Sequence, residues 1–266
     1  MNGSKTKALL WKEWRETRWK FLAFFLAFHP VVWIATVALL VDKENRFSFQ
    51  TTPAKAIYQA LEGVVFAQSM FILTVGAFLI IFYAAGTVSR EIASRRIFFI
   101  LERPVQRWHV LSAKFAISGM QIYTLTALTP LTTLLAAYLG VMLFSRTLSF
   151  EASGPQVLSL AGVALKIGLW RGVVGLMVFS LVFSFSVGFE QWWISLGAGV
   201  ASVITMFYFF GKSLILSIVE PARGHRGEFS LQKFGEISAE TFLVVLLVAA
   251  GCFILSHLLF QRKEIA

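Results

Sequence analysis

The charged residues of this chain are confined to short segments, and long uncharged stretches lie between them. Six of these stretches are long enough to cross a bilayer as helices, which takes about 17–25 residues each. They cover residues 21–41, 64–88, 115–143, 172–189, 191–211 and 241–261. Backbone groups in lipid must be hydrogen-bonded within the protein, and the alternating pattern of barrel strands is absent. The sequence therefore predicts an all-α polytopic membrane protein with six transmembrane helices, forming a single domain over residues 1–266.

The composition agrees with a membrane-embedded chain. Of its 266 residues, 57% are hydrophobic and only 14% are charged, whereas soluble domains carry roughly 25% charged residues. The single cysteine, Cys252, lies inside the last uncharged stretch. The sequence therefore predicts neither a disulfide framework nor a thiolate metal site.

The basic residues predict how the helices cross the membrane. An even number of crossings places both termini on one side, and 14 of the 24 lysines and arginines lie before the first stretch, between the second and third, and after the last. The positive-inside rule therefore predicts a multi-pass protein of the cell membrane (plasma or inner membrane) with both termini in the cytoplasm. The net charge of +10 is not accompanied by a groove-reading motif, so we expect no nucleic-acid partner.

Residues 5–20 predict an amphipathic interfacial helix on the inner membrane face. Lys12 and Glu16 can pair along one side of this helix, whereas Trp11 and Trp14 mark the other. Two interpretations remain open. The helix is a simple interfacial anchor, or it packs against the surface of a partner protein.

The longest external loop is predicted at residues 212–240, where Pro221, Gly224 and Gly227 interrupt the pattern. The fourth and fifth stretches are separated only by a short segment around Glu190, which predicts a tight turn on the inner side.

No acidic residue lies inside any of the six stretches. Ion-driven and proton-driven carriers usually hold a carboxylate near mid-membrane, so the sequence disfavours that class. Lys166 and Arg171 precede the fourth stretch, and their long side chains are expected to snorkel to the outer surface.

Catalytic and metal-binding motifs are absent from the sequence. Gly211-Lys212-Ser213 resembles the end of a phosphate-binding loop, but Met206 stands where the motif needs a glycine. The four histidines show no metal-ligand spacing. We therefore expect no catalytic residue, no metal site and no enzymatic activity in this chain.

The fourth and fifth stretches interleave phenylalanine with serine. These side chains either pack between helices and against lipid, or line a path for a hydrophobic or amphipathic substrate. The candidate path residues are Phe179, Phe183, Ser184 and Phe207.

Residues 89–114 form a charged elbow between the second and third stretches. This elbow holds six basic residues and an apolar run. A helix over residues 89–103, with a Glu91–Arg95 pair, must end before Pro104, because proline disfavours helical geometry in the residue before it. A second helix over residues 108–114 then leads into the third stretch. Such an elbow is suited to being held by a soluble partner that passes movement into the bilayer.

The order of residues in this elbow resembles the cytoplasmic coupling segment of ABC-2 type transporter permeases. Glu91, Pro104, Val105, Arg107 and Lys114 match the family pattern. Arg95-Arg96 stand where the family commonly has Gly-Thr, and Gln106 stands where it has serine. The likeness extends over the whole chain, from the interfacial helix through six spans to an inner C-terminus.

The resemblance implies the membrane subunit of an ATP-driven exporter, with a coupling helix between the second and third spans. Two copies of a separate ATP-binding subunit would bind ATP and Mg²⁺, so this chain itself would bind no cofactor. A second permease subunit, identical or different, would complete the complex. The residues expected to dock on the ATP-binding subunit are Glu91, Arg95, Arg96, Phe98, Phe99, Leu101, Arg103, Pro104, Arg107 and Glu190. The alternative is a non-transporting membrane scaffold or sensor that holds a cytoplasmic partner through the same elbow.

Overall fold

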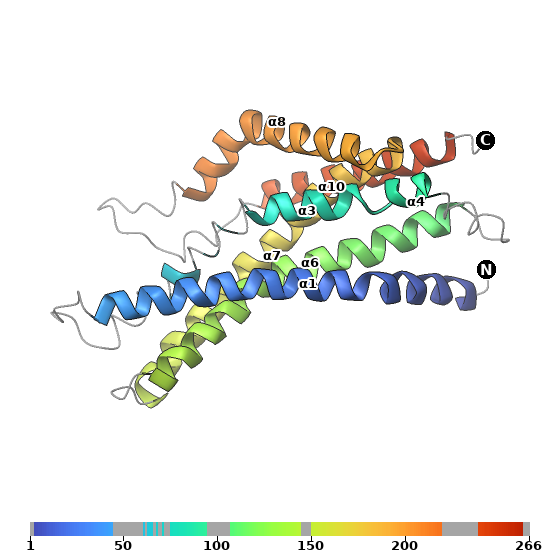
Figure 1. The fold of residues 1–266 in the computed structure, drawn as a ribbon. Coiled ribbons are helices and arrows are strands. Elements are labelled where there is room, and N and C mark those ends of the chain that lie inside the picture. The colour runs from blue at the N-terminus through green and yellow to red at the C-terminus, as the bar shows by residue number, and fades with distance from the viewer. Residues whose placement is uncertain are drawn as a thin grey trace.

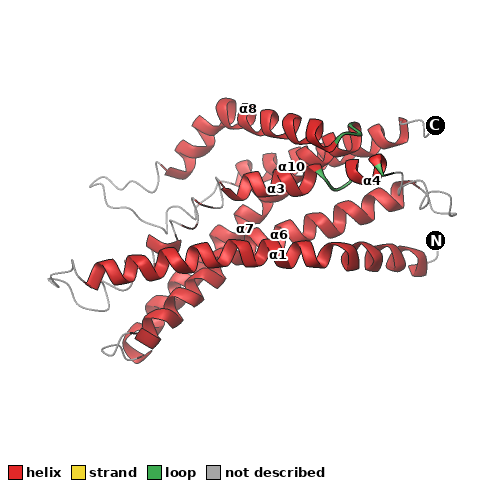
Figure 2. Cartoon of the chain, in the orientation of Figure 1, coloured by secondary structure: helices red, strands yellow, loops and turns green. Residues whose placement is uncertain are grey.

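The computed structural model shows a helical bundle. It describes residues 3–44, 61, 63–65, 68, 71, 75–94, 107–144, 150–219 and 239–262. Within these residues every regular element is a helix and no strand occurs (Figure 2), which confirms the predicted all-α class. The elements are α1 (Gly3–Glu44), α3 (Ala77–Ala85), α4 (Ser89–Ala93), α6 (Arg107–Phe144), α7 (Phe150–Gly188), α8 (Trp192–Val219) and α10 (Ala239–Arg262).

Helix α7 forms the centre of the bundle. It packs against α3, α6, α8 and α10, while α1 lies along α6 (Figure 1). In the most apolar part of α7, 83% of the residues are buried inside the chain, against 17% in α10. Both termini, α4 and the start of α6 lie at one end of the bundle (Figure 1).

Three of the described helices are long and apolar enough to cross a membrane. They are Arg107–Leu139, Val157–Gly188 and Glu240–Arg262. They correspond to the predicted spans at 115–143, 172–189 and 241–261. Their length and apolar composition identify this chain as a membrane protein.

The structure corrects the boundary of the N-terminal helix. Residues 5–20 and the first predicted span form one unbroken helix, α1, of 42 residues, which is about 63 Å long at 1.5 Å per residue. No glycine or proline occurs between Ser4 and His29, so nothing in the sequence breaks the helix at the expected corner. A separate interfacial helix was the wrong prediction.

Two further boundaries differ from the sequence prediction. Helix α8 continues to Val219, because apolar helix-forming residues follow Lys212 and the first proline is Pro221. The predicted external loop therefore cannot begin at residue 212, and residues 220–238 lie outside the described part. Helix α7 starts at Phe150, so the segment before the fourth predicted span belongs to the same helix.

The elbow helix is shorter than predicted. Helix α4 ends at Ala93, and the Ser94 N–H bonds back to the Arg90 and Ile92 carbonyls. The Ser94 hydroxyl also donates to the Glu91 carbonyl at 3.3 Å, and serine side chains compete with helix propagation in this way. One helix from 89 to 103 is therefore wrong, and residues 95–106 lie outside the described part. The predicted helix at 108–114 is confirmed as the first two turns of α6.

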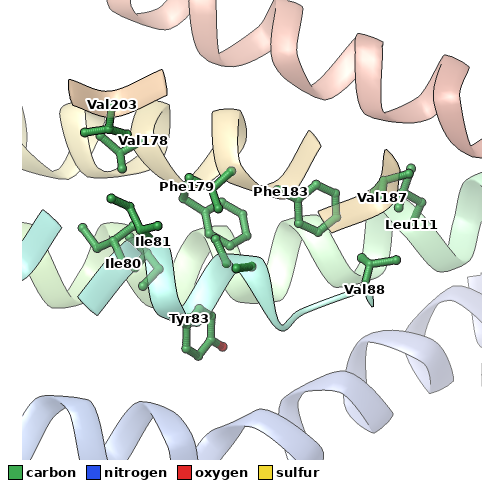
Figure 3. Packing of buried hydrophobic residues seen from close by; sticks show 14 of the residues in the cluster. Ile80, Ile81, Tyr83, Val88, Leu111, Val178, Phe179, Phe183, Val187 and Val203 are labelled. Atoms are coloured by element: carbon green, nitrogen blue, oxygen red, sulfur yellow. The ribbon is translucent and has the colours of Figure 1, made fainter. Parts of the chain in front are cut away.

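The main core cluster lies where α3, α6, α7 and α8 meet (Figure 3). Its labelled side chains are Ile80, Ile81, Tyr83, Val88, Leu111, Val178, Phe179, Phe183, Val187 and Val203. Tyr83 lies at the edge of this cluster, with its ring turned toward α1 (Figure 3). A close approach of α6 and α7 at Gly168 adjoins the core, because a Cβ there would lie 2.1 Å from the Ala127 carbonyl oxygen.

Replacing Gly168 with alanine is expected to destabilise the bundle, because the added methyl group collides with the α6 backbone. Overpacking costs about 1–3 kcal/mol, which thermal unfolding of the purified protein in detergent would record as a lower Tm. Gly162→Ala is the matched control, since nothing lies within 4 Å of a Cβ at that position. Equal Tm values for the two variants would contradict the close packing of α6 and α7.

Candidate functional site

The structure describes two parts of the elbow, the short helix α4 and the first two turns of α6, and α4 lies where several helices meet. It packs against α7 and α8, and its side chains connect it to α6 and, through α6, to α1. We refer to this meeting point as the α4 junction, made of Glu13, Tyr83, Ser89, Arg90, Glu91, Lys114, Gln121, Ser186 and Trp192.

A serine from another helix caps the start of α4. The Val88 and Ser89 N–H groups donate to the Ser186 hydroxyl of α7 at 3.0 and 3.1 Å. The first N–H groups of a helix have no partner within the helix, and a hydroxyl oxygen is a common acceptor for them. Ser186 therefore fixes where α4 begins and ties this point to the central helix.

A buried lysine joins three helices at the junction. The Lys114 Nζ atom of α6 lies 3.0 Å from both carboxylate oxygens of Glu13 in α1. It also lies 2.5 Å from Glu91 Oε1 in α4. The Lys114 side chain is 1% exposed, that of Glu13 5% and that of Glu91 21%. Removing one partner of such a buried pair is strongly destabilising, by about 3–5 kcal/mol, because an uncompensated charge remains inside.

A second lysine adds positive charge at this site. Lys12 contacts Glu13 at 3.5 Å and the exposed Glu16 at 3.3 Å. The carboxylate oxygens of Glu13, Glu16 and Glu91 lie within 4.8 Å of one another, a spacing that a metal ion could use. However, Lys12 and Lys114 already place two ammonium groups among them. We therefore interpret the cluster as an ion-pair network.

A chain of hydrogen bonds continues from the ion pair into the bundle. The Gln121 amide of α6 donates to the Thr17 hydroxyl at 2.8 Å and accepts from the Tyr83 hydroxyl at 2.6 Å. Thr17 in turn donates to the Glu13 carbonyl at 2.7 Å. All of these side chains are buried. Buried polar groups need such partners, so this chain fixes the relative positions of α1, α3 and α6.

An arginine on the outer side of α4 connects the elbow to α8. The Arg90 guanidinium carbon lies 4.9 Å from the Trp192 ring centroid and 5.8 Å from that of Phe82. The two rings meet edge to face at 5.9 Å. Trp192 begins α8 after the segment 189–191, so the predicted tight turn around Glu190 is confirmed and lies beside α4.

The predicted docking residues divide into three groups. Glu91 bonds to Lys114 inside the bundle, whereas the expected pair with Arg95 involves a residue outside the described part. Arg107 is half-buried at the first position of α6, and Glu190 is exposed in its turn. The remaining candidates lie outside the described residues, namely Arg95, Arg96, Phe98, Phe99, Leu101, Arg103 and Pro104.

The predicted path residues serve packing in this structure. Phe179 and Phe183 are 0% exposed, and their ring centroids lie 5.6 and 5.4 Å from that of Phe115. Ser184 bonds to the Ser256 hydroxyl and the Cys252 carbonyl of α10 at 2.9 and 2.8 Å. A substrate path along these residues would require the helices to separate. The side chain of Phe207 lies outside the described part.

Sequence reasoning missed several buried polar residues. Arg171 was expected at the outer surface, yet it is 3% exposed within α7, whereas Lys166 is exposed as expected. Glu13, Gln121 and Ser186 were not singled out as site residues. Helical spacing could have predicted the burial of Glu13. It places Glu13 on the face of α1 opposite Trp11, Arg15 and Arg18, and this face packs against α6.

Replacing Lys114 with methionine is expected to destabilise the protein by about 3–5 kcal/mol, because Glu13 and Glu91 would lose the buried ammonium group between them and only the partly exposed Lys12 would remain beside Glu13. The triple variant Glu13→Gln, Glu91→Gln, Lys114→Met should recover much of this loss, since no buried charge of the ion pair is left. Thermal unfolding in detergent measures both effects, and Lys166→Met at an exposed site is the control. If the triple variant is no more stable than the single one, the ion-pair interpretation is wrong.

A comparison with models of known protein families finds no match for this sequence, and a comparison with curated protein sequences finds none either.

Proposed function

We propose that this chain is the membrane-spanning subunit of an ATP-driven transporter of ABC-2 type, which exports a hydrophobic or amphipathic substrate. A separate cytoplasmic subunit hydrolyses ATP and moves the elbow by docking on its residues 89–107. The observation that carries the proposal is the α4 junction. Helix α4, where the elbow begins, forms an ion pair with α6, hydrogen bonds with α7 and a cation–π contact with α8. Lys114 of α6 connects it further to α1.

The arrangement of the chain ends supports this proposal. Both termini, α4, the start of α6 and the start of α8 lie at one end of the bundle (Figure 1). With this end in the cytoplasm, as the distribution of basic residues predicts, a soluble ATPase reaches the elbow and the Glu190 turn together.

The partner is proposed to be an ABC-type ATP-binding subunit, present in two copies with ATP and Mg²⁺. Its acidic groups would contact Arg95, Arg96, Arg103 and Arg107. Its apolar groups would contact the aromatic and leucine side chains of the elbow. A second permease subunit, identical or different, would complete the complex in the cell membrane.

The energy scale of the junction fits a mechanical link. A partner shifts a conformational equilibrium only through contacts that differ between the two states. Moving an equilibrium from 1:99 to 99:1 requires about 5.5 kcal/mol. Leaving one charge of the Lys114 ion pair uncompensated inside the bundle would cost about 3–5 kcal/mol, a comparable amount. A force on the elbow can therefore move α1 and α6 together with α4 at a free-energy cost similar to that of separating α4 from them.

A non-transporting scaffold or sensor remains a second candidate. The full burial of Phe179 and Phe183 suits it, because a scaffold needs no path between its helices. Co-purification separates the two: an ATP-binding subunit should be recovered with the tagged chain if the first proposal is correct, and its persistent absence favours the scaffold.

Replacing Arg103 and Arg107 with glutamate is expected to abolish substrate-stimulated ATP hydrolysis by the co-purified complex, because the elbow would repel an acidic docking surface. Membrane insertion should remain intact, as judged by the yield of folded protein. Lys166→Glu, at the exposed position on α7, is the control. Unchanged stimulation in the double variant would refute docking through these arginines.

Glu91→Gln is expected to separate docking from coupling. The ATP-binding subunit should still co-purify, because the Glu91 carboxylate bonds to Lys114 inside the bundle. Stimulation of ATP hydrolysis by substrate should fall several-fold, because α4 is held less firmly. Loss of co-purification with this variant would show that Glu91 contacts the partner directly.

A further inference from the structure

The first five turns of α1 present an exposed stripe of aromatic and basic side chains. Trp11 and Trp19 are 64% and 67% exposed, and Trp14 is also exposed. We call this set the Trp–Arg stripe, made of Lys7, Trp11, Trp14, Arg15, Arg18 and Trp19, all of them exposed.

The stripe lies on the side of α1 opposite the α4 junction. Glu13 and Thr17 are buried and face α6. Trp11, Arg15 and Arg18 follow one another at spacings of four and three, which places them on one face of the helix. Within the described part of the chain, that face is left uncovered.

The charge of the stripe is positive. Glu16 is the exposed carboxylate in these turns, and it is paired with Lys12 at 3.3 Å. The Arg18 guanidinium carbon lies 5.7 Å from the Trp19 ring centroid. Tryptophan beside arginine is typical of the boundary between lipid headgroups and hydrocarbon, where an aromatic ring and a snorkelling cation are both satisfied.

The stripe continues into an apolar surface without a break. Leu22 and Leu26 follow Arg18 on the same face and are 42% and 56% exposed. An acidic protein surface would pair with the arginines, but it would supply no apolar contact for these leucines. A phospholipid supplies an anionic phosphate and, directly next to it, the hydrocarbon chains.

We propose that the Trp–Arg stripe is a docking site for anionic phospholipid headgroups of the inner leaflet. Arg15 and Arg18 bind the phosphate, and the Trp19 ring, between Arg18 and Leu22 along the helix, lies at the level of the glycerol backbone. The acyl chains lie along Leu22 and Leu26. The lipid thereby occupies the face of α1 opposite the one that holds Glu13 against Lys114.

The test is native mass spectrometry of the full chain in detergent, titrated with phosphatidylglycerol or with phosphatidylcholine. The wild-type chain should bind phosphatidylglycerol more tightly. Arg15→Gln and Arg18→Gln should each weaken that binding about fivefold, the effect of losing one cation near an anionic surface. Arg15→Lys should retain most of it, and phosphatidylcholine binding should not change.

Lys166→Gln is the matched control, because it removes one exposed positive charge from a different helix. An equal loss in this control, or unchanged phosphatidylglycerol binding in both arginine variants, overturns the proposal. The proposal is also overturned if a protein co-purifies with the wild-type chain but not with the arginine variants, while those variants still bind phosphatidylglycerol. The stripe would then be a protein interface. The measurement uses this chain without an ATPase, so a negative result leaves the proposed transport function untouched.

Discussion

A single buried ammonium group joins three helices at one end of this bundle. Lys114 of α6 is enclosed by the carboxylates of Glu13 from α1 and Glu91 from α4. A charge in the protein interior is tolerated only with partners of opposite charge and good geometry. The three helices are therefore constrained to one arrangement at this end. The hydrogen bonds that join Thr17, Gln121 and Tyr83 lie deeper in the bundle, and they fix α1, α6 and α3 relative to one another.

The apolar packing around α7 complements this polar link. Phe179 and Phe183 fill the space between α3, α6 and α7, and Gly168 lets the α6 backbone come close. In lipid the hydrophobic effect does not drive helices together, so close packing and hydrogen bonds decide which helices associate. The serine contacts between α7 and α10 belong to the same class. A chain tied in this way resists local distortion, and displacement of α4 is passed to whole helices.

The sequence predicts the helical class, three of the spans and the turn at Glu190, because these follow from the spacing of charges along the chain. It does not predict which charges pair. Glu91 has a cation four residues away at Arg95, yet it bonds to Lys114, 23 residues away. Local spacing carries no information on such tertiary contacts. The same holds for Arg171, which is buried by neighbouring helices and not by its own sequence context. The only indication in the sequence that α1 is unbroken is that no helix-breaking residue lies near residue 20.

The central claim is that α4 moves together with α1 and α6 when the elbow is moved. Because Cys252 is the only cysteine, Cys252→Ala gives a background for spin labels at the exposed positions Arg15 of α1, Ala93 of α4 and Lys166 of α7. Electron paramagnetic resonance of the complex with the proposed ATP-binding subunit, with and without trapped nucleotide, measures the distances between the labels. The account predicts unchanged distances between positions 15 and 93 and between positions 93 and 166, because Lys114 joins α4 to α1 and Ser186 joins it to α7. A change confined to the 15–93 distance would mean that α4 moves without its helices and would contradict it.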